Sequence, residues 1–296
     1  MSKRRKNPRS AATDAAPKRQ KIRDIFVARP FEGLADEPEW IALRELVPAA
    51  SAPLRLRPEI VEEYGDRPIT LSTVLPMAWP AMTRADGRVF IGLQRHVQSG
   101  DVSRDLAVAI LSALRTEPGG TVAVPALPGE GPRLQDILVD GPLEIAMHDT
   151  FEYWLDEAQA DDPNVKASLE RANASIYPTE RLAAAHAAYW CRVPDKAHVR
   201  WVLPEEEDAA LDALSRLSAG GELRLGEDTK FAGMFRAHGL LVPVWDVPGA
   251  PAAGDWEAPL AELAKRYTDA LADSGPLDGA ARRAKQGLVG RQLTLR

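Results

Sequence analysis

The sequence contains a single cysteine, Cys191, and only five histidines among its 296 residues. One cysteine excludes an intramolecular disulfide and argues against a metal site built from thiolates. No two histidines lie three to five residues apart, as paired metal ligands on one element commonly do. Phosphate-binding motifs of the form Gly-x-x-x-x-Gly-Lys-Ser/Thr, or Gly-x-Gly-x-x-Gly after a strand, are also missing. We therefore expect neither a metal ion nor a cofactor.

Long apolar segments are missing as well. No window reaches the ~18 uninterrupted apolar residues that a membrane-spanning helix requires. The N-terminus lacks the apolar core of a secretory signal. The composition, 45% hydrophobic and 27% charged, is ordinary for a soluble globular protein. The sequence therefore predicts a cytoplasmic protein that does not bind membranes.

Charge is divided unevenly along the chain. Residues 1–23 contain nine Lys and Arg against one acid, a balance of +8, and residues 275–296 have a balance of +4. Because the whole chain carries −6, the region between these two ends carries −18. An acidic body with basic ends is suited to contact a polyanion through its ends alone.

The basic N-terminal segment is the leading candidate for function. It has no apolar periodicity and is too charged to collapse, so we expect it to be disordered alone. It contains no base-reading module, and binding to RNA, a ribosome or DNA would therefore lack sequence specificity. The protein is then a non-catalytic accessory factor tethered by this tail; a solubilising leader is the alternative. The candidate nucleic-acid-binding residues are Lys3, Arg4, Arg5, Lys6, Arg9, Lys18, Arg19 and Lys21.

Hydrophobic periodicity predicts alternating helices and strands in the first half. Residues 36–47 carry an apolar stripe of Trp40, Leu43 and Val47 and read as a helix capped by Asp36. The other predicted elements are strands at 69–75 and 89–93 in an antiparallel hairpin with a turn at 85–87, a helix at 101–115, and strands at 121–124 and 143–147.

The second half begins with a helical stretch that prolines interrupt. The predicted elements are helices at 151–157, 165–172 and 180–191, a strand at 198–203, a helix after Pro204, a strand at 240–244 and a helix at 255–272. A strand that ends on Val-Leu-Pro occurs in each half, at residues 74–76 and 202–204. This match suggests a weak internal duplication.

These elements predict an α+β fold of two α+β subdomains with mostly antiparallel sheets, joined to disordered basic tails. The expected units are a basic N-terminal tail, two α+β domains and a basic C-terminal tail, with boundaries at residues 1–24, 25–149, 150–274 and 275–296.

Signs of catalysis are few, and the sequence favours a protein that is not an enzyme. No Gly-x-Ser-x-Gly nucleophile elbow occurs. His148 shares a strand face with Glu144 and precedes Asp149, so it is the best candidate for a general base. An enzyme of dispersed residues around His148 and Asp149 is therefore one alternative function, while a solvated strand end explains the same pattern without catalysis.

Trp79 is the candidate partner-binding residue. It stands between Met77 and Pro80 in a segment that begins at Pro76, and prolines favour a loop there. An aromatic side chain on a surface loop can anchor a protein partner. A protein–protein scaffold of unknown partner is thus the other alternative function, and simple burial of Trp79 is the structural one.

Four segments carry a resemblance to a known family. They read Arg-Pro-Phe-Glu-Gly-Leu at 29–34, Leu-Pro-Met-Ala-Trp-Pro at 75–80, Gly-Pro-Arg-Leu-Gln-Asp at 131–136 and Phe-Arg-Ala-His-Gly-Leu-Leu-Val-Pro-Val-Trp at 235–245. Together they resemble a family of actinobacterial proteins known only as a domain of unknown function. The resemblance implies a soluble cytoplasmic protein of an actinobacterium and carries over no catalytic or binding residue.

Overall fold

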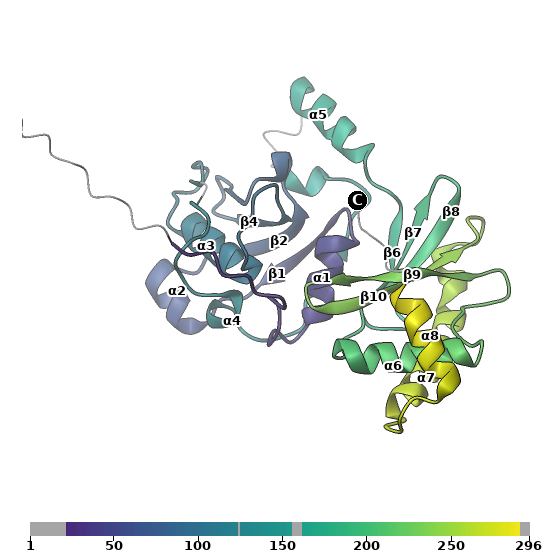
Figure 1. The fold of residues 1–296 in the computed structure, drawn as a ribbon. Helices are drawn as coiled ribbons and strands as arrows, with labels where there is room; N and C mark the ends of the chain where they lie inside the picture. Colours follow the sequence, from purple (N-terminus) through teal and green to yellow (C-terminus); the bar gives the residue numbers. More distant parts are fainter. Residues whose placement is uncertain (1–21, 124, 156–161, 291–296) are drawn as a thin grey trace, which may run out of the picture.

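The computed structural model describes residues 22–123, 125–155 and 162–290. These residues form two five-stranded sheets with helices around them (Figure 1). The sheet of the first half is mixed, whereas the sheet of the second half is antiparallel. The predicted α+β fold is confirmed.

The first sheet has the strand order β3-β4-β2-β1-β5. Its neighbours pair antiparallel except β2 and β4, which are parallel. The predicted hairpin between these two strands is therefore wrong, because the turn at 85–87 joins β4 to a three-residue strand that is too short for alternation to reveal. The strands are β1 (Ala50–Leu54), β2 (Ile69–Val74), β3 (Ala81–Thr83), β4 (Val89–Gln94) and β5 (Ala146–Met147).

Helices α1 (Glu37–Glu45) and α3 (Val102–Leu114) form where the sequence predicts them. Asp101 caps α3, since its carboxylate accepts the N–H of Arg104 at 3.3 Å. The predicted cap of α1 by Asp36 is wrong: its carboxylate accepts the N–H of Leu143 at 2.7 Å instead. Two short helices were not predicted, α2 (Pro58–Tyr64) and α4 (Leu134–Ile137).

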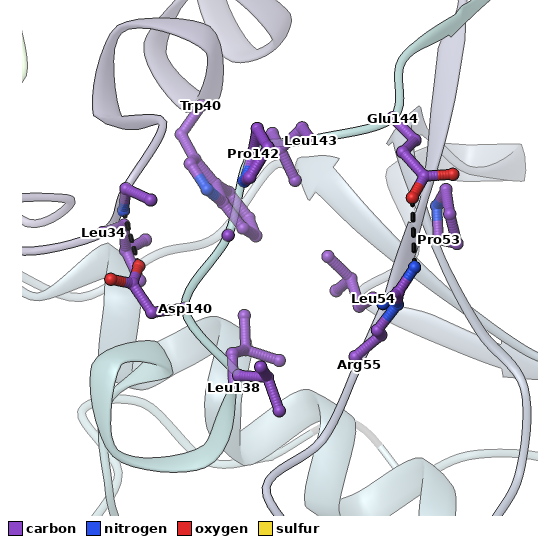
Figure 2. A pocket seen from close by; sticks show the side chains of 13 residues that line it. Leu34, Trp40, Pro53, Leu54, Arg55, Leu138, Asp140, Pro142, Leu143 and Glu144 are labelled. Carbon is purple, nitrogen blue, oxygen red and sulfur yellow. Dashed lines mark hydrogen bonds and ion pairs between the residues drawn. The ribbon is translucent and has the colours of Figure 1, made fainter.

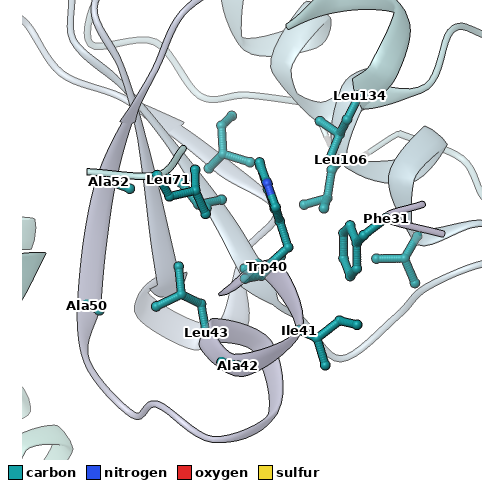
Figure 3. Close-up of a cluster of buried hydrophobic side chains, with 14 of the residues drawn as sticks. Phe31, Trp40, Ile41, Ala42, Leu43, Ala50, Ala52, Leu71, Leu106 and Leu134 are labelled. Atoms are coloured by element: carbon teal, nitrogen blue, oxygen red, sulfur yellow. The ribbon is translucent and has the colours of Figure 1, made fainter. Parts of the chain in front are cut away.

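The first hydrophobic core lies between α1, α3 and the first sheet (Figure 3). Trp40 stacks on Phe31 with ring centroids 5.7 Å apart, and Leu43, Leu71 and Leu106 are buried beside them. Full burial of a side chain of this kind stabilises a fold by about 1.5–3 kcal/mol. Tertiary packing of the predicted apolar stripe therefore stabilises α1.

The second sheet has the strand order β6-β7-β8-β10-β9. The helix predicted at 180–191 is wrong, because this segment supplies β6 and β7. Alternation explains the difference: Tyr189 faces the first core and Trp190 the second. The strands are β6 (Thr179–Leu182), β7 (Ala188–Val193), β8 (Lys196–Trp201), β9 (Lys230–Ala237) and β10 (Leu240–Val247).

Helices α5 (Pro163–Asn173), α6 (Glu207–Ala219) and α7 (Glu257–Ala272) agree with the prediction. The C-terminal tail was expected to be disordered, but half of it forms α8 (Gly279–Val289), which packs on α6. Leu288 is buried there, and Lys285 lies 2.6 Å from the carboxylate of Asp212. Part of the C-terminal positive charge is therefore paired with the body. Within the described residues, no helix has the length and apolarity to cross a bilayer.

The two halves share a continuous interface, with α1 between the sheets (Figure 1). The face of the second sheet that carries Tyr189, Phe235 and Val242 belongs to the first core. Arg181 forms an ion pair with Glu39 across this junction, and the imidazoles of His186 and His238 lie 2.8 Å from the carboxylates of Asp36 and Glu45. The junction is therefore both apolar and ionic.

Three further expectations are corrected. Residues 121–123 are not a strand, residues 143–147 contribute only the two-residue β5, and the helix predicted at 151–157 is a 3₁₀ turn (Glu152–Trp154). The internal duplication gains no support, because the two sheets differ in strand order and direction.

Candidate functional site

The proposed nucleic-acid contacts lie outside the described residues: Lys3, Arg4, Arg5, Lys6, Arg9, Lys18, Arg19 and Lys21. The chain joins the folded body next to Gly100. The carboxylate of Asp24 accepts the N–H of Gly100 at 2.8 Å, and the N–H of Val27 donates to the carbonyl of Gly100 at 2.8 Å. The described structure therefore fixes where the basic segment is attached.

Trp79 lies in the loop between β2 and β3, in a cluster of exposed apolar side chains. The sequence left two alternatives for Trp79, a surface position and burial. Its side chain is 37% exposed, between the two. Met77 is 83% exposed and Val97, after β4, is 67% exposed. We call Met77, Trp79 and Val97 the Met77 surface.

The backbone holds Met77 outward at an energetic cost. Met77 and Ala78 have φ of 57° and 50°, in the left-handed region that side chains disfavour. Such residues cost about 1–3 kcal/mol each and persist where the surrounding structure enforces them. Gly92 on β4 permits the conformation, because its N–H donates to the Pro80 carbonyl at 3.0 Å and the loop lies directly against it.

An apolar cavity lies on each side of Met77. One has a volume of about 550 Å³ and is lined by Trp154 and by Leu169 of α5. The other has a volume of about 330 Å³ and is lined by Trp79, Pro125 and Leu127. Both volumes are large enough to accept an apolar side chain from another molecule.

Arg95 forms part of the wall of the smaller cavity. Its side chain is buried, and Nη2 lies 3.6 Å from Oδ2 of Asp105. Burial lowers the pKa of Arg95 to about 10. The Nε and Nη2 atoms have no hydrogen-bond partner within the described part of the chain. The wall of this cavity therefore contains a buried guanidinium that is paired with Asp105.

His148, the candidate general base, lies beside Ser51 of β1. Its Nε2 is 2.7 Å from the Ser51 hydroxyl, and its ring stacks on Tyr153 with centroids 4.1 Å apart. Burial lowers the pKa of His148, against the raising effect of the nearby Asp149 charge. A neutral imidazole beside a hydroxyl is one requirement of nucleophilic catalysis. The adjoining pocket holds only about 130 Å³, and catalysis at His148 stays a prediction.

A fourth pocket lies between Trp40 and the loop of residues 138–144 (Figure 2). On one side Asp140 accepts the N–H of Ala35 at 2.8 Å, and on the other Glu144 pairs with Arg55 at 3.1 Å. Its volume of about 150 Å³ suits a few water molecules. Both carboxylates are already engaged, so this pocket offers less than the Met77 surface. No group of three or more metal-ligating side chains comes together anywhere in residues 22–123, 125–155 and 162–290.

Comparison with known protein families tests the family resemblance that the four sequence segments suggest. The model described as "Family of unknown function (DUF5926)" matches residues 30–296. The chain belongs to this family. No curated protein and no solved structure gave a match. Membership in DUF5926 covers both sheets, Trp79 and His148, whereas the eight basic candidates precede the matched region.

Sequence reasoning found part of this site. Proline spacing identified the loop of Trp79, whereas the outward position of Met77 and the exposure of Val97 gave no signal of their own. These residues come together because β2 and β4 are parallel neighbours, so that the loop after β2 and the segment after β4 lie at the same end of the sheet. The loop that carries Met77 packs against Gly92 through the carbonyl of Trp79, a tertiary contact that the sequence does not show.

Proposed function

We propose that this DUF5926 protein is a binding protein that takes up a protein partner at the Met77 surface. The observation that carries the proposal is the position of Met77, a large apolar side chain held almost fully exposed between two apolar cavities. Clustered exposed apolar side chains mark interaction sites more often than chance exposure does. Methionine also adapts its shape to a partner.

The expected partner offers apolar side chains. One of them would fill the cavity beside Trp79, where it would displace water from Pro125 and Leu127. This arrangement is that of an interface in which a few anchors supply most of the binding energy.

Replacing Met77 with aspartate should weaken partner binding by about 10–100-fold, since burial of such a side chain contributes about 1.5–3 kcal/mol. Proteins captured from cell extract by the wild-type chain and by Met77→Asp would be compared, and the dissociation constant of a recovered partner would then be measured with purified proteins. Trp79→Ala should have the same direction of effect.

Val139→Asp is the matched control, because Val139 is a 49% exposed apolar residue away from the Met77 surface. It should bind like the wild type. Equal capture by the wild type, Met77→Asp and Trp79→Ala would refute the proposal, and so would self-association of the purified chain through this surface.

The charge asymmetry supports a second proposal, that the basic N-terminal segment contacts a polyanion. Deletion of residues 1–21 should abolish binding to a labelled single-stranded RNA of mixed sequence at low salt. For the full chain, log K should fall with log salt at a slope of about −0.7 per phosphate contacted. Fluorescence anisotropy would measure both. A chain of unchanged length with the eight basic residues replaced by glutamine is the control, and binding equal to that of the full chain would contradict the proposal.

A further inference from the structure

A cleft lined by both polar and apolar side chains lies at the junction of the two halves, away from the Met77 surface. Two pockets of about 220 and 130 Å³ share the lining residues Pro48, Tyr177 and Thr179. Pro48 follows α1 in the first half, whereas Tyr177 and Thr179 lead into β6 of the second. We call the two pockets together the Tyr177 cleft.

Arg200 places an uncompensated positive charge in this cleft. It lies on β8, where its neighbours Val199 and Trp201 belong to the second core, so Arg200 points to the opposite face, toward the first half. It is half-buried and lines the larger pocket. Within the described residues, no carboxylate oxygen approaches its guanidinium within 4.0 Å. A half-buried cation without a counterion favours the binding of an anion.

The other charged side chains of the cleft do not neutralise the positive charge of Arg200. Arg44 is buried with its Nε 3.1 Å from Nε2 of His238, and it donates to the carbonyl of Leu93. Glu45 is engaged by both neighbours, at 2.8 Å from His238 and 3.4 Å from Arg44. The smaller pocket contains Asp149 and His148, so the anion would lie in the larger one.

Two uncharged neighbours complete the environment. Cys191 on β7 lines the larger pocket, and burial raises the pKa of its thiol, so the thiol stays neutral and does not repel an anion. Tyr177 is 55% exposed at the part common to both pockets. Its ring offers a face on which a planar group can stack.

We infer that the Tyr177 cleft binds a small molecule with an oxyanion, held by Arg200, and a planar ring that packs on Tyr177. The oxyanion is a phosphate or a carboxylate, because a guanidinium recognises both through paired N–H donors. This binding is independent of the Met77 surface, and loss of partner binding in Met77→Asp would leave it unchanged.

Cys191 makes the inference testable, because it is the only cysteine of the chain and lines the pocket. The rate of its alkylation by iodoacetamide would be followed at alkaline pH, where part of this thiol is ionised, by mass spectrometry of the full-length protein. Adenosine monophosphate, inorganic phosphate and benzoate are the probes. A probe present at ten times its dissociation constant leaves only about one tenth of the sites empty. It should therefore slow the alkylation about tenfold. Protection by adenosine monophosphate identifies a phosphate site, and protection by benzoate a carboxylate site.

Arg200→Gln should remove the protection, whereas Arg192→Gln should retain it. Arg192 is the matched control, because it is exposed on the neighbouring strand with its guanidinium over the Trp190 ring. Isothermal titration calorimetry with the same probes gives binding constants independent of alkylation, and circular dichroism verifies that each variant is folded. The inference is overturned if no probe binds the wild type, or if the two arginine variants behave alike.

Discussion

Replacing Glu39 with alanine should lower the free energy of unfolding by about 3–5 kcal/mol, the cost of breaking a buried ionic contact on one side. The Glu39 side chain is fully buried in α1. Its Oε2 accepts the Tyr189 hydroxyl at 2.6 Å, and its Oε1 lies 2.6 Å from Nη2 of Arg181. Alanine would leave the buried hydroxyl without an acceptor. Urea unfolding at constant pH would measure the change.

The contribution of Tyr189 can be separated by a double-mutant cycle. Tyr189→Phe alone leaves Oε2 of Glu39 without its donor, and should cost about 1–3 kcal/mol. Combined with Glu39→Ala it should add less than its own cost, because the two residues share one contact. Glu144→Ala is the control: its ion pair with Arg55 is exposed, and its loss should change stability by no more than about 1 kcal/mol. Additive effects of Glu39→Ala and Tyr189→Phe would contradict the expectation.

The fold could be predicted where one element buries one apolar stripe. Helix α3 agrees with its predicted range within one residue at each end, because its apolar spacing and the Asp101 cap both act locally. Residues 180–191 contradict their prediction for the opposite reason. Tyr189 and Trp190 bury against different cores, and that two-sided burial is a property of the assembled halves.

The same limit applies to the sites. Sequence spacing identified Trp79 and His148 one at a time, but not their neighbours in space. Ser51 reaches His148 only because β1 pairs with β5. Arg200 and Cys191 share a cleft only because β7 and β8 are adjacent strands, and β7 was predicted to be helical. The C-terminal segment was expected to be a free tail because of its positive charge. Only two residues of α8 are buried, Ala281 and Leu288, and they are too few to give a clear apolar stripe.

Replacing Gly92 with alanine should displace the loop that carries Met77, and it tests whether the fold itself holds the Met77 surface open. A Cβ at Gly92 would lie 2.5 Å from the carbonyl oxygen of Trp79 and 3.4 Å from the Leu75 side chain. The first contact is with backbone, which cannot rotate away, so the loop must lift off β4. Overpacking of this kind costs about 1–3 kcal/mol.

The displacement should affect binding as well as stability. The Gly92–Pro80 hydrogen bond holds the end of this loop against β4, so we expect its loss to let Met77 and Ala78 relax and partner binding to fall as far as in Met77→Asp. Gly287→Ala is the matched control, since no atom lies within 4 Å of a Cβ at that helical position and alanine stabilises helices by about 0.5–1 kcal/mol. Full partner affinity in a folded Gly92→Ala variant would show that the turn conformation is not needed, and that the exposed side chains suffice.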